Sequence, residues 1–373
     1  MHIGLNAHLL SHQTGYRSAG IHSYIDHLLP HLAIHAPDDW RFTAMVGGKN
    51  SVRYDRVTMR RARIDTESPL KRILWEQLAQ PFQLGDFDLY HGLAFIAPLW
   101  LSIPAVVTVY DLTFIHYPGR LSPARRLYLR LFTGVSCRRA RRVIAISQST
   151  ARDLTARLNI PADRIDVTPL ACDPAIFRPL PPEQIATFRR ENDLPERFWL
   201  FLGTLEPRKN LTVLLEAYAA LPQNERLPLI LAGGKGWQYD DIFAAVEHHH
   251  LGGEVHFPGF IPATTLPFWY NSAEVFVYPS VFEGFGLPVL EAMACGTPVI
   301  TSKVSSLPEV AGNSGLCLPP HDRAAWTEAL HRAFHDTHWR VQARDKGLAE
   351  AKGFTWEKTA QLTVSSYRRA LDG

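Results

Sequence analysis

Cysteine is scarce in this chain of 373 residues, and long hydrophobic runs are missing. The four cysteines are scattered and form no C-x-x-C pair: Cys137, Cys172, Cys295 and Cys317. This pattern excludes a disulfide framework and favours a reducing compartment with mostly buried thiols. No apolar run reaches the length of about 20 residues that crosses a bilayer. The start, MHIGLNAHLL, lacks the basic segment and long apolar core of a signal peptide, so we expect a cytoplasmic protein.

An excess of charge of one sign is also missing, because 39 lysines and arginines face 36 aspartates and glutamates. A net charge of +3 is too small to indicate nucleic-acid binding, and no zinc finger, RNA-binding signature or basic tail is present. The composition, with 46% hydrophobic and 20% charged residues, is typical of globular proteins. A mass of 42.0 kDa exceeds one ordinary core and suits two domains.

Strand-like apolar runs alternate with helical stretches along the whole chain, which predicts an α/β protein with parallel sheets. The predicted strands are 2–7, 42–46, 88–92, 105–110 and 142–147 in the first half, then 199–204, 228–233, 255–260, 274–279 and 298–301. Ser147 is the expected N-cap of the helix that follows it. We predict a first domain at 1–175, a proline-rich linker at 176–197, a second domain at 198–353 and a final helix at 354–373.

The most informative stretch is VFVYPSVFEGFGLPVLEAMACGTPVIT at 275–301. A short strand leads into a loop that carries Glu283, and a helix then begins near Pro288 and ends before Gly296, as proline and glycine preferences indicate. Glu291 lies in the first turns of that helix. The sequence therefore places one carboxylate above a strand end and a second just inside the next helix.

Backbone N–H groups at the start of this helix would point into the same space as the two carboxylates. They belong to Phe285, Gly286 and Leu287. A helix N-terminus binds phosphate, and carboxylates accept hydrogen bonds from sugar hydroxyls. The combination predicts a nucleotide-sugar site. The alternative is that Glu291 only complements the helix dipole and Glu283 is a solvated loop charge.

The string EGFGLPVLEAMACGTPVI resembles the E-x7-E signature of the retaining GT-B glycosyltransferases of family 4, the glycosyl transferases group 1 type. The resemblance implies two Rossmann-like domains that face each other across a cleft, with the last helix crossing back to the first domain. It also implies that Glu283 contacts the donor sugar and that Glu291 holds the ribose.

Two adjacent cations, Arg208 and Lys209, follow a predicted strand at the end where open α/β sheets bind ligands. They would stabilise the negative charge that a diphosphate gains as it leaves. The resembling family has a pattern near G-R-L-x-x-x-K, and this chain reads GTLEPRKN. Lys209 matches the family lysine, Thr204 replaces the family arginine on the donor side, and Arg208 would supply the second cation. The alternative is a solvated pair before a helix capped by Asn210.

Three more donor contacts are implied by the resemblance. The loop LAGGKGW at 231–237, which is not a Walker loop, would border the nucleotide, and the backbone of Phe260 and Ile261 would meet the nucleobase. In the first domain, Gly20 at the end of GYRSAG would let the backbone approach the donor phosphate. Ordinary turns are the alternative for all of these segments.

Side chains of the acceptor or sugar side are expected where predicted strands of the first domain end. They are His91, Tyr110 and Asp111. Many relatives have a histidine that contacts the transferred sugar where this chain has Tyr110. Asp111 would accept a hydrogen bond from a sugar or acceptor hydroxyl, or it is satisfied by the protein itself.

No metal and no other cofactor is expected. The D-x-D pair Asp86 and Asp88 precedes a strand and would lie away from the ligand edge, and the run His248–His250 is typical of a solvated helix end. No Ser-His-Asp set and no H-E-x-x-H motif is visible. Eight arginines fall within 120–142 among apolar residues, which fits either a contact with an anionic membrane surface or a solvated helix face.

These observations predict a retaining enzyme that moves a hexose from a nucleoside diphosphate sugar to a hydroxyl acceptor, such as a glycan or a lipid-linked sugar. The segments GTLEPRKN and ACGTPVI resemble those of family members that use GDP-mannose, which favours mannose as the transferred sugar. A nucleotide-sugar epimerase or a phosphorylase on the same fold is one alternative, although no pyridoxal-phosphate lysine context is visible. A non-catalytic sugar-nucleotide sensor is another, and the set Glu283, Glu291 and Lys209 argues against it.

Overall fold

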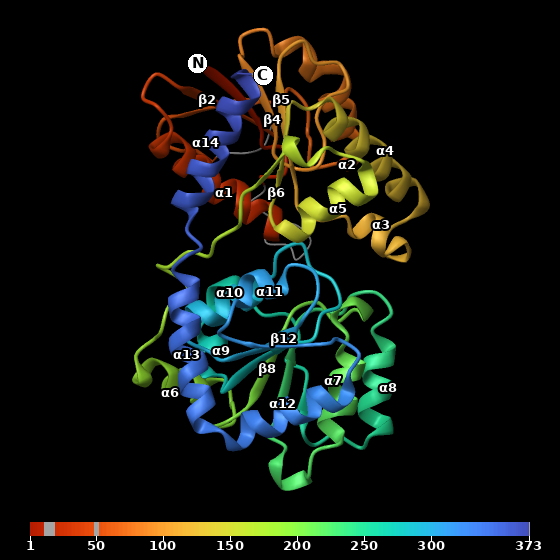
Figure 1. Cartoon of the computed structure of the whole chain (residues 1–373), viewed down its shortest axis with the longest axis vertical. Coiled ribbons are helices and arrows are strands. Elements are labelled where there is room, and N and C mark those ends of the chain that lie inside the picture. The colour runs from red at the N-terminus through yellow and green to blue at the C-terminus, as the bar shows by residue number, and fades with distance from the viewer. Residues whose placement is uncertain (11–18, 48–51, 373) are drawn as a thin grey trace. The chain divides into compact units, whose positions relative to one another are not determined.

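The computed structural model describes residues 1–10, 19–47 and 52–372, which form two compact units (Figure 1). The N-terminal unit consists of Met1–Leu170 and Thr355–Gly373, and the C-terminal unit of Ala171–Phe354. Across the described ranges, no helix combines the length and the apolar character that crossing a bilayer requires.

The N-terminal unit is built on a seven-stranded parallel sheet with the order β3-β2-β1-β4-β5-β6-β7. Its strands are β1 (His2–Asn6), β2 (Arg41–Val46), β3 (Val57–Arg61), β4 (Leu89–Gly92), β5 (Ala105–Val109), β6 (Arg142–Ala145) and β7 (Ile165–Val167). All five residues of β5 are buried, as expected of a central strand that helices cover on both faces.

The helices of this unit follow the predicted alternation with strands. They are α1 (Ala19–His35), α2 (Pro69–Leu74), η1 (Trp75–Ala79), η2 (Gln80–Gln83), α3 (Thr113–His116), η3 (Pro118–Arg120), α4 (Pro123–Arg139), α5 (Gln148–Leu158), η4 (Ala162–Arg164) and α14 (Trp356–Asp372). The predicted cap is confirmed, because Ser147 Oγ accepts a hydrogen bond from the N–H of Thr150 at 3.0 Å, and α5 begins directly after it.

The last helix, α14, belongs to the N-terminal unit, as the family resemblance implies. It lies beside α1 (Figure 1), where Trp356 stacks on His27 with ring centroids 5.0 Å apart. On the sheet side, the hydroxyl of Tyr367 lies 2.6 Å from Nδ1 of the buried His91. The C-terminal end of the chain is therefore part of the core of this unit.

The C-terminal unit has a six-stranded parallel sheet with the order β10-β9-β8-β11-β12-β13. Its strands are β8 (Trp199–Leu202), β9 (Leu229–Ala232), β10 (Val255–His256), β11 (Val275–Tyr278), β12 (Val299–Ser302) and β13 (Leu316–Leu318). In both units the first strand has the second on one side and the fourth on the other, which is the Rossmann-type order. Ligands of such sheets bind where this order reverses, which is here beyond the carboxyl ends of β8 and β11.

Helices cover both faces of this second sheet. They are α6 (Pro182–Glu191), η5 (Pro207–Lys209), α7 (Leu211–Ala219), η6 (Gln223–Glu225), α8 (Asp240–His248), η7 (Ala263–Thr265), α9 (Leu266–Ser272), α10 (Leu287–Ala294), α11 (Leu307–Ala311), α12 (Arg323–His335) and α13 (Thr337–Ala351).

The segment 176–197, expected as a linker, is part of the C-terminal unit and contains α6. Phe188 of α6 is buried and lies against two aromatic rings of α9, with centroids 5.2 Å from Phe268 and 5.8 Å from Trp269. The prolines misled the prediction because Pro182 stands in the first turn of α6, where its missing N–H costs no hydrogen bond.

A buried carboxylate joins α14 to the sheet. Asp166 of β7 accepts hydrogen bonds from Arg142 at 2.8 Å, Ser366 at 2.7 Å and Arg369 at 2.8 Å. Burial by itself would raise the pKa of Asp166, but the hydrogen bonds from Arg142 and Ser366 and the charges of Arg142 and Arg369 outweigh it and lower the pKa. The ionised carboxylate therefore stabilises the position of α14.

Asp166→Asn should lower the free energy of unfolding by about 2 kcal/mol at pH 7, because charge-assisted hydrogen bonds contribute about 1.5–3 kcal/mol. Since the pKa of Asp166 is lower in the folded state, its contribution is present above the unfolded pKa of about 4 and is lost as the pH falls below it. Urea unfolding at several pH values measures the difference. The exposed Asp163→Asn is the control, and an equal loss in both variants would contradict the assignment.

Candidate active site

Four charged side chains form a buried ion network beyond the carboxyl ends of β8 and β11. Lys209 Nζ lies 2.6 Å from Glu283 Oε1, and Arg208 lies 2.8 Å from Glu283 Oε2 and 2.8 Å from Glu206 Oε1. The exposed fractions are 8% for Arg208, 5% for Lys209 and 2% for Glu206. The alternative of solvated loop charges is therefore excluded for Glu283, Arg208 and Lys209.

The sheet explains why these residues meet although more than 70 positions separate Arg208 from Glu283. Strands β8 and β11 are hydrogen-bonded neighbours, with Val275 opposite Trp199, and both run in the same direction. Their carboxyl ends consequently lie side by side, and each loop brings its charged residues to that edge. A backbone hydrogen bond of 2.9 Å from Val281 N–H to the carbonyl of Arg208 holds the two loops together.

Asn210 does not cap α7 as expected from the sequence. Its backbone has φ +56°, in the left-handed region, and its side-chain amide donates to the carbonyl of Pro320 at 2.6 Å. Asparagine tolerates this conformation better than most residues do. The residue therefore fixes the turn that carries Lys209 rather than the first amides of the helix.

Glu283 is held in its ionised form by its neighbours. Burial alone would raise its pKa, but Arg208 and Lys209 hold the pKa far below the usual range of a glutamate. The hydroxyls of Tyr278 and Ser280 also donate to Oε1 of Glu283, at 2.9 Å and 2.7 Å. The carboxylate is thus a fixed negative charge with a defined orientation.

For Lys209, burial outweighs the effect of the neighbouring carboxylate on the pKa. Burial and the neighbouring charge of Arg208 lower its pKa to about 8, and the attraction of Glu283 opposes this shift. Its ammonium group also contacts the hydroxyl of Tyr278 and lies 4.7 Å from the centre of that ring. Two positive and two negative groups make the network neutral by formal charge, which lowers the cost of burying it.

The predicted anion binding at the start of α10 stays a prediction, and the backbone there has two features that bear on it. Gly286 precedes the helix with φ +108°, and a Cβ atom there would lie 2.9 Å from Leu307 Cδ2, so this position requires glycine. Among the described residues, none accepts a hydrogen bond from the N–H groups of Phe285, Gly286 or Leu287. The hydroxyl of Ser305 fixes the loop before the helix, because it accepts a hydrogen bond from Glu283 N–H at 2.9 Å.

Glu291 is the fifth residue of α10 and has surroundings unlike those of Glu283. Its Oε2 accepts a hydrogen bond of 2.8 Å from the hydroxyl of Tyr270 in α9. Burial raises the pKa of Glu291 to about 7, although the Tyr270 hydrogen bond opposes this shift. No cation pairs with this carboxylate among the described residues, so it changes between neutral and ionised forms near neutral pH.

The other predicted donor segments lie along the same edge of the sheet. Leu205 N–H, next to Thr204, donates to the carbonyl of Gly234 at 3.0 Å, and Gly233 N–H donates to the carbonyl of Gly259 at 2.7 Å. A Cβ atom at Gly233 would lie 1.8 Å from the Gly203 carbonyl oxygen, so glycine permits this close approach.

These bonds join the loops that follow β8, β9 and β10. Phe260, 58% exposed, and the buried Ile261 therefore belong to the same edge as Thr204. Their predicted contact with a base stays a prediction.

The structure corrects the prediction for His91. This residue is 0% exposed inside β4, and Nε2 lies 2.8 Å from Thr108 Oγ1 while Nδ1 lies 2.6 Å from the Tyr367 hydroxyl. Burial lowers the pKa of His91 to about 3, so the ring is neutral and both of its nitrogens are bonded within the unit. His91 joins α14 to the sheet and has no free atom for a sugar.

Tyr110 is likewise a packing residue rather than a sugar contact. Its ring packs edge-on against Tyr24 with centroids 5.3 Å apart, and its hydroxyl donates to the carbonyl of Leu93 at 2.8 Å. Asp111, directly after β5, is partly buried and accepts a hydrogen bond of 2.7 Å from the N–H of Thr113. The alternative of an Asp111 satisfied by the protein itself is therefore favoured.

Gly20 is exposed in the first turn of α1, and no atom of the described residues lies within 4 Å of a Cβ atom built on it. Packing against the described residues therefore does not explain a glycine there. The rest of the GYRSAG segment up to residue 18 lies outside the described residues.

The D-x-D pair lies at the start of β4, as expected. Asp88 accepts a hydrogen bond of 2.7 Å from the N–H of His2, and Asp86 lies 3.7 Å from Arg60. Both carboxylates thus have partners at the amino ends of the strands of the N-terminal sheet, since His2 begins the neighbouring strand β1.

Sequence reasoning missed three groups that hold the network: Glu206, Tyr278 and Ser280. The only signal for them is position, because each stands within a few residues of the end of β8 or β11. Glu206 is the most important of these, since it balances the second positive charge of the buried pair.

Family models match both halves of the chain. Residues 20–176 match "Glycosyltransferase Family 4", and residues 184–349 match "Glycosyl transferases group 1". The O-antigen chain mannosyltransferase B of Escherichia coli is 37% identical over 293 residues, which are 78% of this chain and 77% of that protein. The chain belongs to the group 1 glycosyltransferases. It is therefore a transferase enzyme, and the prediction of the family is confirmed.

Two further similarities concern this glycosyltransferase. The serotype-specific mannosyltransferase WbdA of Escherichia coli is 33% identical over 238 residues, which are 62% of this chain but only 29% of that protein. Sucrose-phosphate synthase from Thermosynechococcus elongatus has a similar structure, with a TM-score of 0.78 and 24% identity over 99% of this chain and 98% of that one. The likeness confirms the predicted GT-B fold with two Rossmann-like domains.

The glycosyltransferase should change its stability with pH through Glu291. Because the pKa of Glu291 is about 7 in the folded state and about 4.5 in the unfolded chain, the folded state binds the extra proton, and this group destabilises the fold as the pH rises from 4.5 to 7. Glu291→Gln should therefore gain unfolding free energy relative to the natural protein over that range, by at most about 3 kcal/mol. Urea unfolding between pH 5 and 8 measures this gain, and a constant difference would contradict it.

Proposed function

We propose that this glycosyltransferase moves mannose from a nucleoside diphosphate mannose to a hydroxyl group of a growing glycan or lipid-linked sugar, with retention of the anomeric configuration. Two relatives that carry the name mannosyltransferase support the choice of sugar, one of them over most of its length. The observation that carries the proposal is the pairing of Lys209 and Arg208 with Glu283, next to the amides at the start of α10.

The diphosphate of the donor would bind to the amides of Phe285, Gly286 and Leu287 and to the two cations. At about 4 Å each cation contributes roughly 4 kcal/mol of attraction at an intermediate dielectric, before desolvation is subtracted. Both oxygens of Glu283 already pair with these cations, so an arriving diphosphate competes for them. That competition leaves Glu283 able to accept hydrogen bonds from the sugar hydroxyls.

The transfer would proceed on one face of the sugar. The bond between the anomeric carbon and the diphosphate oxygen breaks, the acceptor oxygen bonds to the same face, and the acceptor proton passes to the departing phosphate. Arg208 and Lys209 stabilise the charge on the leaving group, and Glu283 stabilises the positive charge that develops on the sugar. Glu291 would bind the ribose. No metal is needed for this chemistry, because Arg208 and Lys209 would stabilise the negative charge that a metal ion stabilises in other transferases.

A donor panel tests this function. Incubation with GDP-, UDP- and ADP-sugars and a mannose-terminated acceptor should give transfer of mannose and release of the nucleoside diphosphate, with the α-linkage of the donor retained in the product. Glu283→Gln should lower kcat at least about 100-fold, as loss of a group that stabilises the transition state does. The exposed Glu247→Gln on α8 is the matched control.

Thermal unfolding of Glu283→Gln checks that the variant is folded, because the change also removes the partner of two buried cations. Conversion of the donor without an acceptor would instead indicate an epimerase. An inverted product would remove the retaining mechanism, and an unchanged kcat in Glu283→Gln would remove this residue from the chemistry.

We also propose that α4 brings the enzyme to an anionic membrane surface. Leu127 and Leu131, one turn apart, are 57% and 53% exposed, and Arg126 and Arg130 beside them are exposed as well. Exposed leucines among arginines are typical of helices that lie on lipid, where each basic residue contributes about 1 kcal/mol. A lipid-linked acceptor would be presented at such a surface.

Sedimentation with vesicles tests this contact. The enzyme should bind vesicles that contain phosphatidylglycerol more tightly than neutral ones. The double variant Arg126→Gln with Arg130→Gln should bind them about 30-fold more weakly, because two residues at about 1 kcal/mol each are removed. Lys346→Gln with Lys352→Gln on exposed positions of the C-terminal unit is a control of equal charge. Equal binding by both double variants would show that α4 is only a solvated helix.

A further inference from the structure

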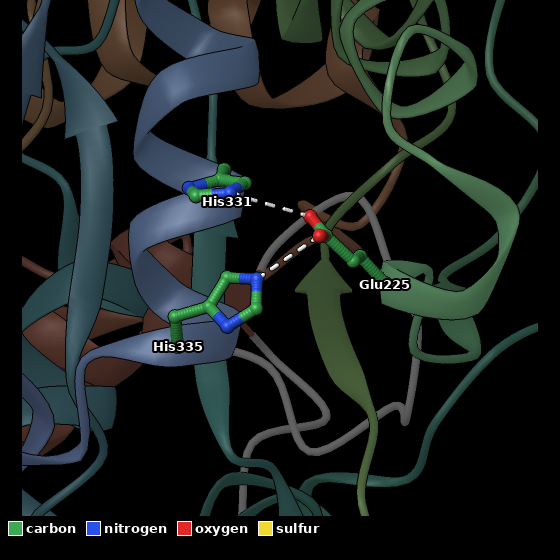
Figure 2. Close-up of side chains that lie close together, drawn as sticks. All are labelled: Glu225, His331 and His335. Atoms are coloured by element: carbon green, nitrogen blue, oxygen red, sulfur yellow. Dashed lines mark ion pairs between the residues drawn. The ribbon is translucent and has the colours of Figure 1, made fainter.

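Two imidazoles lie on one face of α12 in its last two turns (Figure 2). His331 and His335 are four residues apart, which brings them together on a helix, and their ring centroids are 4.5 Å apart. Glu225, from the short helix η6 that follows α7, points toward both rings (Figure 2). Its Oε1 lies 3.1 Å from His335 Nε2, and its Oε2 lies 3.5 Å from His331 Nε2.

The carboxylate of this cluster is less exposed than its partners. The side chain of Glu225 is 15% exposed, against 53% for His331 and 48% for His335. Among the described residues none donates a hydrogen bond to the buried Oε2 of Glu225. A buried acceptor without a donor costs free energy, which a cation between the three side chains would offset.

We propose that Glu225, His331 and His335 bind one zinc ion. In the part of the chain that the structure describes, this is the only group of three or more His, Cys, Asp or Glu residues whose ligand atoms all lie within 4.8 Å of one another. Zinc binds imidazole nitrogens and carboxylate oxygens at about 2.0–2.2 Å, so the ligands of a tetrahedral ion lie about 3.4 Å apart. The two N···O distances, 3.1 Å and 3.5 Å, lie on either side of this value.

The donor set selects the kind of metal. Magnesium and calcium prefer oxygen ligands throughout, whereas two imidazoles with one carboxylate suit zinc and related transition metals. Three protein ligands leave a fourth position for water, and the half-exposed histidines make that position accessible from solvent.

The surroundings also favour a cation. The hydroxyl of Thr327 in the first half of α12 donates to the carbonyl of Ala217 near the end of α7 at 3.1 Å, so the two helices are joined about one turn before His331. The carboxyl end of a helix carries a partial negative charge, and His331 and His335 stand in the last turns of α12. A metal ion there would tie the end of α12 to the connection between α7 and β9.

The zinc ion would stabilise the fold and would not take part in transfer. Lys209 precedes the first residue of α7, and Glu225 follows its last turn. A helix of nine residues is about 13 Å long, so the ion is well separated from the network around Glu283. The sequence predicts transfer without a catalytic metal. A zinc ion that only stabilises the fold does not conflict with that prediction.

Calorimetric titration of the untagged full chain, freed of metal with EDTA and then dialysed, tests the proposal. Zinc should bind at one tight site, and saturating zinc should raise the melting temperature by about 5 °C, because a ligand that binds the folded state stabilises it. Glu225→Gln should weaken zinc binding about 100-fold, and so should His335→Gln, which alters an exposed side chain and leaves the core intact. Cobalt bound in place of zinc should give visible absorption bands that these variants lack.

A matched control is available on α1. His31 and His35 have the same spacing, with ring centroids 6.3 Å apart, but belong to no group of three metal-ligating side chains among the described residues. His31→Gln with His35→Gln should bind zinc like the natural protein. No tight site in the natural protein, or the same affinity in Glu225→Gln and His335→Gln as in the natural protein, would overturn the proposal and leave the cluster as an ion pair.

Discussion

One buried ion network holds together the loops beyond the carboxyl ends of β8 and β11 in the C-terminal unit. Glu283 pairs with Arg208 and Lys209, and Glu206 supplies the second negative charge. Removing these charges from water is costly, and only mutual pairing and hydrogen bonds to Tyr278 and Ser280 offset that cost. The network consequently fixes the loops after β8 and β11 relative to each other. The loops that carry the proposed donor site are thereby held in place by ion pairs within the protein itself.

The two glutamates of the E-x7-E motif differ because of their surroundings and not because of their residue type. Glu283 lies between two cations, so it stays ionised throughout the physiological pH range. Glu291 lies beside Tyr270 without a cation, so burial dominates and its pKa rises to about 7. One carboxylate is therefore a fixed charge between two cations, and the other is a hydrogen-bonding group whose charge depends on pH. This difference suits the two roles proposed for them.

In the N-terminal unit, His91, which was predicted for the acceptor side, instead serves the packing of α14, and Asp166 does so as well. His91 bonds Tyr367, and Asp166 of β7 bonds Ser366 and Arg369 of the same helix. These contacts join the last helix of the chain to strands β4 and β7, which lie about 200 or more positions earlier in the sequence. The residues that select the acceptor must therefore lie elsewhere than at His91 and Tyr110, whose polar side-chain atoms are already bonded within the unit.

The sequence by itself determined the alternation of strands and helices, the cap at Ser147 and the motif that brings Glu283 and Glu291 to one helix start, because these features depend on neighbouring residues. It also identified Lys209, through a family pattern. Only the tertiary structure decided the ionisation of Glu283 and Glu291, the burial of His91 and the meeting of Glu225 with His331 and His335. These properties arise from segments far apart in the chain, and the order of strands in the sheet, which no local pattern encodes, brings such segments together.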